Sequence, residues 1–374
     1  MVKILFITHE MNDGGVSRLL KDIQKTLIGD NTNGKILTLF GQGEMFDNFT
    51  CDTLTNGDIN IQKLRKNSIF LKLVYLLQSP IIVIKFLYYI RNYKPDIIVT
   101  NMWGSDIISL LVNKKGCQNI VSIQHDVVKI GPFLRVLKIM ALKRADYVIA
   151  ISQAVKQFLI SYFKVPESKI KIIYNGIETK RFLSYTKNNT VKNLVFGTVA
   201  RLDKIKGHIY TLEGLNLLKK QYGLTPKFIF VGDGAERAEL EDYAKSHNLN
   251  NVEFVGQQLD ISPYLSQIDV FILPSLSEGL GVAIIEAMTA AKCVIATNID
   301  GIKELITDSE TGFLVEPQNS EAICNKIKWC LDYPDEARKM GVLAQQYILN
   351  NQAIFDINNS VLKYKALFKE LMMQ

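Results

Sequence analysis

The stretch DVFILPSLSEGLGVAIIEAM, which runs from Asp269 to Met288, shows most clearly how this chain folds. Its apolar run from Val270 to Leu273 is rich in β-branched and aromatic residues and predicts a buried strand. Beyond Gly281 the apolar residues recur with the period of a helix, and the segment between is rich in glycine and serine. A strand, a glycine-rich turn and a helix in that order form the repeating unit of a parallel α/β sheet.

The same unit recurs along the whole chain. Short β-branched runs alternate with amphipathic stretches in two successive series, which predicts an α/β fold built from two doubly wound, Rossmann-like parallel sheets. The expected strands cover residues 2–8, 35–40, 96–101, 119–124, 146–152 and 169–175 in the first series, and 193–199, 226–232, 251–256, 269–274, 292–297 and 312–315 in the second.

The length of 374 residues also favours two domains, because single cores usually stop growing below that size. The polar, non-periodic stretch 181–193 follows the turn-forming pair Asn175-Gly176, so we expect domains at 1–183 and 184–354. In open α/β sheets ligands bind beyond the carboxyl ends of the strands. Two such domains would therefore enclose a substrate in the cleft between them.

Composition narrows the class of protein. The five cysteines are odd in number and contain no Cys-x2-Cys pair, and the short apolar start reads as a strand and not a signal peptide, so we expect a cytoplasmic protein. Residues 1–183 carry 25 Lys and Arg against 14 Asp and Glu, whereas the remainder carries 19 against 23. Such an asymmetry usually marks an anionic partner in the first half.

Glu278 and Glu286 flank the start of the helix that follows the strand at 269–274. Gly279 and Gly281 allow the backbone to approach a ligand closely, and the amides of a helix N-terminus favour a diphosphate or a sugar hydroxyl. Either glutamate alone is accounted for as a helix cap or a solvated side chain. Together with the glycines, the pair favours a site for a nucleotide-sugar, because carboxylates accept hydrogen bonds from the hydroxyls of a sugar and a ribose.

A second group of residues follows the strand at 193–199. Arg201 comes at the end of that strand, and Lys206 precedes the next helix. Fixed cations there would stabilise the negative charge that develops on a diphosphate leaving group. An Arg-x4-Lys pair is also common on surfaces, and its place at a strand end is what favours the functional interpretation.

Weaker candidates stand at other strand ends. Gly232 ends the strand at 226–232 and Gln257 follows the strand at 251–256, and both could contact a base or ribose of the donor. The pair Gly14-Gly15 lies between the first strand and the first helix and could approach a phosphate or sugar of the donor closely. The full Gly-x-Gly-x-x-Gly fingerprint is missing, which argues against a nicotinamide cofactor. His125 ends the strand at 119–124 and could hydrogen-bond a sugar hydroxyl, although structural histidines are more frequent; His9 is a weaker candidate on the same grounds.

No Asp-x-Asp pair or His, Cys and Asp cluster with metal-ligand spacing occurs, so we expect a metal-independent site without a cofactor. The motifs resemble those of the family-4 retaining glycosyltransferases of the GT-B fold, over both halves of the chain. The segments that carry the resemblance are EGLGVAIIE (278–286), VARLDKIKG (199–207), DYVIAIS (146–152), IIYNGIETKRF (172–182) and the glycine pair at 14–15. Leu280 stands where the family usually has phenylalanine, and Val282-Ala283 replaces the common Leu-Pro, which leaves the sugar undetermined.

The resemblance implies a role for each matching residue. Glu286 would hold the ribose hydroxyls, and Arg201 with Lys206 the diphosphate. Glu278 and the backbone of residues 279–281 would hold the donor sugar, which we expect to be linked to UDP, with His125 near that sugar. The family retains the anomeric configuration, and a front-face route with the leaving phosphate as base is favoured. The final helix, about 355–374, would pack back on the first domain.

Two basic and apolar segments in the first half of the chain indicate how the protein reaches its acceptor. Residues 59–95 and 127–145 contain seven and five basic residues, no acidic ones, and many apolar ones. The longest uncharged run, Leu73 to Ile84, is 12 residues, too short for a spanning helix of about 20 residues. Either segment alone could be core with solvated charges, but together they favour contact with an anionic membrane surface.

We therefore expect a glycosyltransferase, peripheral on the inner face of the plasma membrane, that moves a hexose or N-acetylhexosamine to a lipid-linked saccharide in cell-surface polysaccharide or glycolipid synthesis. Nucleic acid is not expected as a partner. The alternatives are a glycosyltransferase with a soluble small acceptor, a non-catalytic GT-B binding subunit, and an enzyme that modifies the nucleotide-sugar itself.

Overall fold

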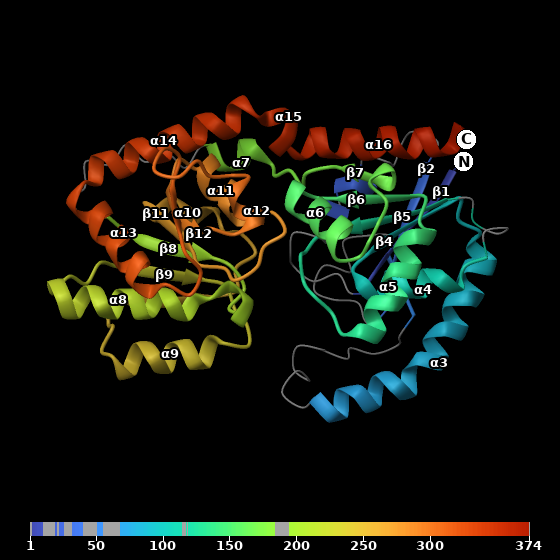
Figure 1. The fold of residues 1–374 in the computed structure, drawn as a ribbon, viewed down its shortest axis with the longest axis horizontal. Helices are drawn as coiled ribbons and strands as arrows, with labels where there is room; N and C mark the ends of the chain where they lie inside the picture. The colour runs from blue at the N-terminus through green and yellow to red at the C-terminus, as the bar shows by residue number, and fades with distance from the viewer. Residues whose placement is uncertain are drawn as a thin grey trace. The chain divides into compact units, whose positions relative to one another are not determined.

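The computed structural model describes residues 2–9, 19–20, 22–25, 32–39, 51–54, 68–113, 117, 119–183 and 194–373. The chain divides into two compact units (Figure 1), each built on a parallel sheet. Unit 1 comprises Met1–Tyr174 and Ser360–Gln374, and unit 2 comprises Asn175–Asn359.

The chain passes into unit 2 after Tyr174, earlier than the expected boundary after residue 183. The reason is the packing of the Asn175-Gly176 turn. A Cβ atom on Gly176 would stand 2.4 Å from the carbonyl carbon of Asp356, and Ile177 pairs with Asp356 in a β-bridge. The helix α7 (Thr179–Leu183) is thereby attached to unit 2.

Unit 1 contains a seven-stranded sheet in the order β3-β2-β1-β4-β5-β6-β7, with every pair parallel. The reversal of strand order at β1 is that of a doubly wound sheet, as expected. The pattern missed only β3, an edge strand of three residues that is too short to show an alternation. The strands are β1 (Val2–Thr8), β2 (Thr32–Thr38), β3 (Cys51–Thr53), β4 (Ile97–Asn101), β5 (Asn119–Gln124), β6 (Tyr147–Ala150) and β7 (Ile170–Ile172).

Helices cover both faces of this sheet. Alternate residues of a strand point to opposite faces. Leu5 and Ile7 share a core cluster with Phe86 of α3, whereas Phe6 packs edge-on against Phe368 of α16. The helices of unit 1 whose bounds the structure describes are α3 (Ser68–Tyr93), α4 (Trp103–Ile108), η2 (Ser109–Leu111), α5 (Pro132–Arg144), α6 (Gln153–Ser161), η3 (Glu167–Lys169) and, from Ser360 onward, α16 (Ile357–Met373).

Helix α16 is attached to unit 1 by polar contacts as well. Glu370 accepts hydrogen bonds from Tyr147 Oη at 3.0 Å and from Lys171 Nζ at 2.7 Å, and Ser360 Oγ donates to the Tyr174 carbonyl at 2.7 Å. The last helix therefore covers the sheet with which the chain began.

Unit 2 contains a six-stranded parallel sheet in the order β10-β9-β8-β11-β12-β13, again doubly wound. All six strands of the second predicted series are present. They are β8 (Phe196–Val199), β9 (Phe228–Val231), β10 (Val252–Gly256), β11 (Val270–Leu273), β12 (Cys293–Thr297) and β13 (Phe313–Val315).

The core of unit 2 contains an aromatic group near one edge of the sheet, where Phe230 of β9 packs against Phe228 of the same strand and against the partly buried Phe254 of β10. Helix α8 packs against α13, and α11 packs against α14. The helices are η4 (Lys204–Lys206), α8 (His208–Tyr222), α9 (Arg237–Ser246), α10 (Ser262–Gln267), α11 (Val282–Thr289), α12 (Asp300–Lys303), α13 (Ser320–Asp332), α14 (Pro334–Asn350) and α15 (Gln352–Phe355), in addition to α7.

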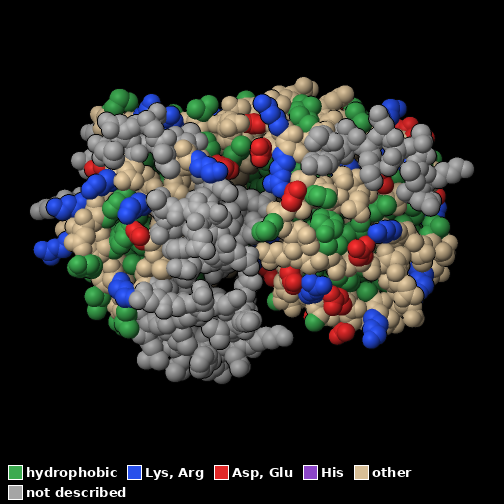
Figure 2. All heavy atoms as spheres, turned by 180° about the vertical axis from the view of Figure 1, so that it is seen from behind, with side chains coloured by type: hydrophobic (Ala, Val, Ile, Leu, Met, Phe, Trp, Pro, Cys, Tyr) green, Lys and Arg blue, Asp and Glu red, His purple; other side chains and the backbone are tan. Residues whose placement is uncertain are grey.

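Within the part of the chain that the structure describes, no helix combines the length and apolar character needed to cross a bilayer. On the face drawn in Figure 2, acidic side chains are most frequent over unit 2. That distribution agrees with the excess of acidic over basic residues in the second half of the sequence.

Candidate functional site

The carboxyl ends of β8 and β11 bring together side chains that lie far apart in the sequence. These strands are parallel neighbours, so the loops that follow them leave the same edge of the sheet. Lys206, in η4, donates a hydrogen bond from Nζ to Oε1 of Glu278, 2.5 Å away in the loop after β11. The two side chains are only 19% and 10% exposed, which distinguishes this ion pair from an ordinary surface contact.

A buried serine fixes the carboxylate of this pair. Ser275, which directly follows Pro274 at the end of β11, donates from Oγ to the same Oε1 of Glu278 at 2.8 Å. Its own carbonyl accepts a hydrogen bond of 2.6 Å from Thr297 Oγ1 at the end of β12. The sequence analysis missed Ser275, although its place between a strand and Glu278 was a usable signal.

Two glycines allow the loops around Glu278 to touch. Gly207 has φ +65°, and a Cβ atom there would stand 2.3 Å from the carbonyl oxygen of Pro274. A Cβ atom on Gly301, in α12, would stand 2.2 Å from the carbonyl oxygen of Glu278. Any larger residue would push these loops apart, so the glycines maintain the geometry of the Lys206–Glu278 pair.

The N-terminus of α11 lies directly after Glu278. Gly281 precedes the helix with φ +66°, a left-handed conformation that favours glycine. Gly279 and Leu280 are buried, and Leu280 is 1% exposed, so its side chain belongs to the core. Glu286 is half-buried within α11. This turn can offer backbone amides to an anion, and an anion site here is still a prediction.

Arg201 is arranged differently from Lys206. Its guanidinium Nη1 lies 2.7 Å from Oδ2 of Asp203, and its side chain is 60% exposed. The two predicted cations thus stand in one loop, but one is held by Glu278 and the other by Asp203, a partner that the sequence analysis missed. An exposed guanidinium in this position can reach a phosphate at little cost in desolvation.

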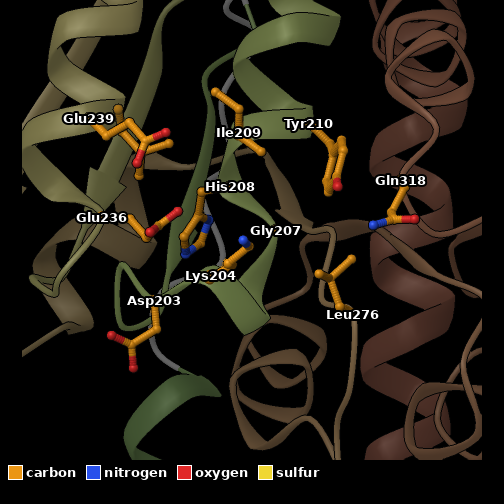
Figure 3. Close-up of a pocket in the computed structure, with 11 residues that line it drawn as sticks. Asp203, Lys204, Gly207, His208, Ile209, Tyr210, Glu236, Glu239, Leu276 and Gln318 are labelled. Carbon is orange, nitrogen blue, oxygen red and sulfur yellow. The ribbon is translucent and has the colours of Figure 1, made fainter. Parts of the chain in front are cut away.

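A cavity of about 170 Å³ lies beside this loop, and Figure 3 shows the residues around it. His208, the first residue of α8, is 3% exposed, and its Nε2 donates a 3.1 Å hydrogen bond to the carbonyl of Arg201. Burial lowers the pKa of His208 to about 4, so the ring is neutral and acts as a support for the loop. The lining residues are Asp203, Lys204, Gly207, His208, Ile209, Tyr210, Glu236, Glu239, Leu240, Leu276 and Gln318.

The glycine at the end of β9 has a packing role. Gly232 has φ +138°, and a Cβ atom on it would stand 2.0 Å from the carbonyl oxygen of Ala200, next to Arg201. Gly256, with φ +84°, ends β10 just before Gln257. Gly232 lies against the residue before Arg201, and Gly256 forms a β-bridge with Gly232. The contact of either turn with a nucleotide is still a prediction.

In unit 1, three polar groups lie at the ends of neighbouring strands. His125, after β5, donates from Nε2 to Oδ1 of Asn101 at the end of β4, at 3.1 Å. His9, after β1, accepts a 3.1 Å hydrogen bond from the amide of Gly104. Burial, and then the nearby Lys138 ammonium, lower the pKa of both histidines to about 4. Neutral imidazoles can bind hydroxyls but carry no charge at physiological pH.

Some predictions stay untested by the geometry. Gly14 and Gly15, and residues 59–67 of the first basic segment, lie outside the described residues. Among the residues that the structure does describe, no group of three or more His, Cys, Asp or Glu side chains is arranged to hold a metal ion. Metal independence is still a prediction.

Two family models match the chain one after the other. The model described as Glycosyltransferase Family 4 matches residues 13–181, and the model described as Glycosyl transferases group 1 matches residues 181–347. The junction of the two matches falls within α7.

Solved structures match over the full length. An Anabaena protein, HepE, crystallised with UDP and glucose, has a TM-score of 0.81 at 23% identity, covering 99% of this chain and 100% of its own. A sucrose-phosphate synthase from Thermosynechococcus elongatus has a TM-score of 0.80 at 22% identity, and the match covers both chains completely. At this identity the likeness concerns the fold.

Curated relatives include an N-acetylgalactosaminyltransferase of Campylobacter jejuni, named for an acceptor saccharide on PP-undecaprenol, which is 24% identical over 89% of both chains. An Escherichia coli galactosyltransferase, named for UDP-Gal and a diphosphoundecaprenol-linked acceptor, is 30% identical over 51% of this chain. That match spans only 52% of the relative's own length, and other curated relatives are covered to a similar extent. Taken with the two matching models, the doubly wound sheets and the strand-end loops, these findings show that the chain belongs to the family-4, group 1 glycosyltransferases and has their GT-B fold.

Proposed function

We propose that this protein transfers a hexose or N-acetylhexosamine from a UDP-sugar to a lipid-linked saccharide, with retention of anomeric configuration and without a metal, during synthesis of a surface polysaccharide or glycolipid. The observation that carries this proposal is the shielded Lys206–Glu278 pair, held by Ser275 beside the N-terminus of α11. An ammonium group, a carboxylate and the amides of a helix N-terminus in one loop cluster suit a sugar linked to a diphosphate.

The chemistry follows from how these groups are charged. When the bond between sugar and diphosphate breaks, negative charge grows on the leaving UDP. Lys206 and Arg201 would stabilise that charge more in the transition state than in the ground state, which lowers the barrier. Glu278 would accept hydrogen bonds from the donor sugar, and Glu286 from the ribose hydroxyls.

The nature of donor and acceptor rests on the relatives. The Escherichia coli relative is named for UDP-Gal and a diphosphoundecaprenol-linked acceptor, and the Staphylococcus aureus protein CapM, 28% identical over 52% of this chain, for capsular polysaccharide biosynthesis. These names support a UDP-sugar and a lipid-linked acceptor for this chain. They do not name its sugar.

We further propose that unit 1 binds the inner face of an anionic membrane through α3 and α5. Helix α3 lies in the connection from β3 to β4, and α5 lies in the connection from β5 to β6. Both connections run in the same direction along the sheet, so right-handed crossovers place the two helices on the same face. Each exposes a row of apolar side chains at helical spacing, and exposed basic residues accompany them: Arg91 and Lys94 near α3, Lys129 and Lys143 near α5. The apolar residues are Ile81, Ile84, Leu87 and Tyr88 in α3, and Phe133, Val136 and Met140 in α5.

The first test is the binding of UDP, GDP, ADP and dTDP, measured by calorimetry on the wild type and on Glu286→Ala. We expect UDP to bind more tightly than the other three nucleotides. Glu286→Ala should raise the Kd for UDP at least tenfold, the equivalent of about 1.4 kcal/mol. Absence of nucleotide binding would contradict the proposal and favour a non-catalytic binding subunit.

The second test is sugar transfer from a panel of UDP-sugars to undecaprenol-diphosphate-linked saccharides in detergent, with and without EDTA. NMR of the product reports the anomeric configuration. Transfer to free saccharides at equal kcat/KM would contradict the lipid-linked acceptor, loss of activity with EDTA would contradict metal independence, and isomerised UDP-sugar without transfer would contradict the transferase assignment.

A further inference from the structure

We infer that Trp103 and Asn101, at the end of β4, form the subsite of unit 1 that binds the sugar ring of the acceptor. This inference rests on the proposed function, because it needs an acceptor saccharide. It concerns residues that carry no charge, in contrast to the cationic loop of unit 2.

The position of Trp103 is the first observation. The residue begins α4 directly after β4, and it is 40% exposed, as is Met102 before it. Met102 has φ +79°, a conformation that L-residues rarely adopt and that costs energy. The strained residue thus stands directly before the exposed Trp103, at the start of α4.

The strain is held by specific contacts. The amide of Gly104 donates to Nε2 of His9, and Ser105 Oγ donates to the carbonyl of Met102 at 2.8 Å. The indole of Trp103 also packs edge to face on the imidazole of His9, with ring centroids 5.4 Å apart. Trp103 is therefore a fixed surface, whose orientation costs little entropy when a ligand binds.

Asn101 supplies the polar part of the subsite. Its side chain is wholly buried, and its Oδ1 accepts from His125, but its Nδ2 has no hydrogen-bond partner in the described structure. A buried amide donor without an acceptor costs free energy, and native proteins usually satisfy such groups. His125, which donates to Asn101 Oδ1, is the residue that the family resemblance places near the donor sugar.

The chemistry of these groups selects a neutral sugar. An exposed indole presents an apolar face with a polar edge, and amide and neutral imidazole groups exchange hydrogen bonds with hydroxyls. A diphosphate would instead require cations, and among the described residues the cation whose charge acts on His9 and His125, Lys138, is 5% exposed and lies 3.8 Å from Asp106. The strand ends of β1, β4 and β5 are thus equipped for a hydroxylated ring.

The chain allows a direct binding measurement, because it contains only two tryptophans, Trp103 and Trp329. In Trp329→Phe the tryptophan emission comes from Trp103 alone. We expect at least one methyl glycoside among those of glucose, galactose, N-acetylglucosamine and N-acetylgalactosamine to change this emission saturably. The matched control is Trp103→Phe, whose remaining Trp329 should not respond.

Kinetics on the lipid-linked acceptor provide the second readout. Trp103→Ala should raise KM for the acceptor by about tenfold, with recovery in Trp103→Phe, while UDP affinity stays at the wild-type level. An unchanged acceptor KM in a Trp103→Ala protein that binds UDP normally, or an emission of Trp103 that no glycoside alters, would overturn the inference. If the wild type binds glycosides at Trp103 but transfers no sugar, the proposed function fails and the subsite stands.

Discussion

Lys138 and Asp106 form an ion pair in the interior of unit 1, with Nζ 3.8 Å from Oδ2 and with side chains only 6% and 1% exposed. Thr100, Ser122 and Gln124 donate hydrogen bonds of 2.6, 2.6 and 2.9 Å to the same carboxylate. Burial raises the pKa of Asp106, while Lys138 and these donors oppose the rise. The pair connects α5 to the strand ends that carry His125.

Lys138→Met should therefore destabilise unit 1 by about 3 kcal/mol, because it leaves a buried carboxylate without its cation. The measurement is urea unfolding followed by Trp103 emission in a Trp329→Phe background, which observes unit 1. Adding Asp106→Asn should restore part of the loss. Strictly additive effects of the two substitutions would show that the residues do not interact.

Lys206→Ala should lower kcat for sugar transfer by about 10²–10³-fold, in the range seen when one group that stabilises a developing charge is removed. Lys204→Ala is the matched control, since Lys204 lies in the same short helix but is exposed. It should retain nearly the wild-type rate. Equal losses in both variants would mean that general positive charge, and not the Lys206–Glu278 geometry, matters.

Gly301→Ala should destabilise unit 2 by about 1–3 kcal/mol and weaken UDP-sugar binding, because the new methyl group would meet the carbonyl of Glu278. Gly131→Ala is the control in unit 1, where no atom outside the neighbouring residues lies within 4 Å of such a Cβ; it should leave the stability of its own unit, followed by Trp103 emission in a Trp329→Phe background, unchanged. Unfolding followed by Trp329 emission in a Trp103→Phe background observes unit 2. Wild-type stability in Gly301→Ala would contradict the close packing of these loops.

The low pKa of His208 predicts a pH-dependent stability of unit 2. The pKa of His208 is about 6.5 in the unfolded chain and about 4 in the folded protein, so between these pH values only the unfolded state binds a proton at this residue. The free energy of unfolding should therefore fall as pH decreases from 6.5 to 5, by up to about 1.4 kcal/mol per pH unit for this one group. His208→Gln should have a shallower dependence by that amount; parallel curves for both proteins would contradict the assignment.

Phe133→Glu should reduce flotation of the protein with phosphatidylglycerol vesicles several-fold, because it replaces a 75% exposed apolar contact with a charge of the wrong sign. Leu259→Glu removes an 81% exposed leucine from unit 2 and serves as the control. A wild type that does not float with such vesicles, or an equal loss in both variants, would contradict docking through α5.

Most of the fold could be predicted from the sequence because its signals are local. Strands such as β8 and β11 are marked by short β-branched runs, and the turns after them by glycines, so the α/β class and the candidate loops followed from neighbours in the chain. Glu278 and Lys206 were both recognised in this way. β3 was not, because three residues at a sheet edge show no period.

The pairing of these residues required the tertiary structure. The order of strands β8 and β11 and the lengths of their loops decide which of the two cations, Lys206 or Arg201, pairs with Glu278. Lys206 and Glu278 are 72 positions apart in the sequence and therefore give no local sign of their contact. Ser275, Gly301 and the Lys138–Asp106 pair escaped prediction for the same reason. The sequence by itself determined where the strands end and which loops carry the candidate site residues, because hydrophobic periodicity is local. Only the packing of the sheets decided which side chains meet, because burial and hydrogen bonding act between distant segments.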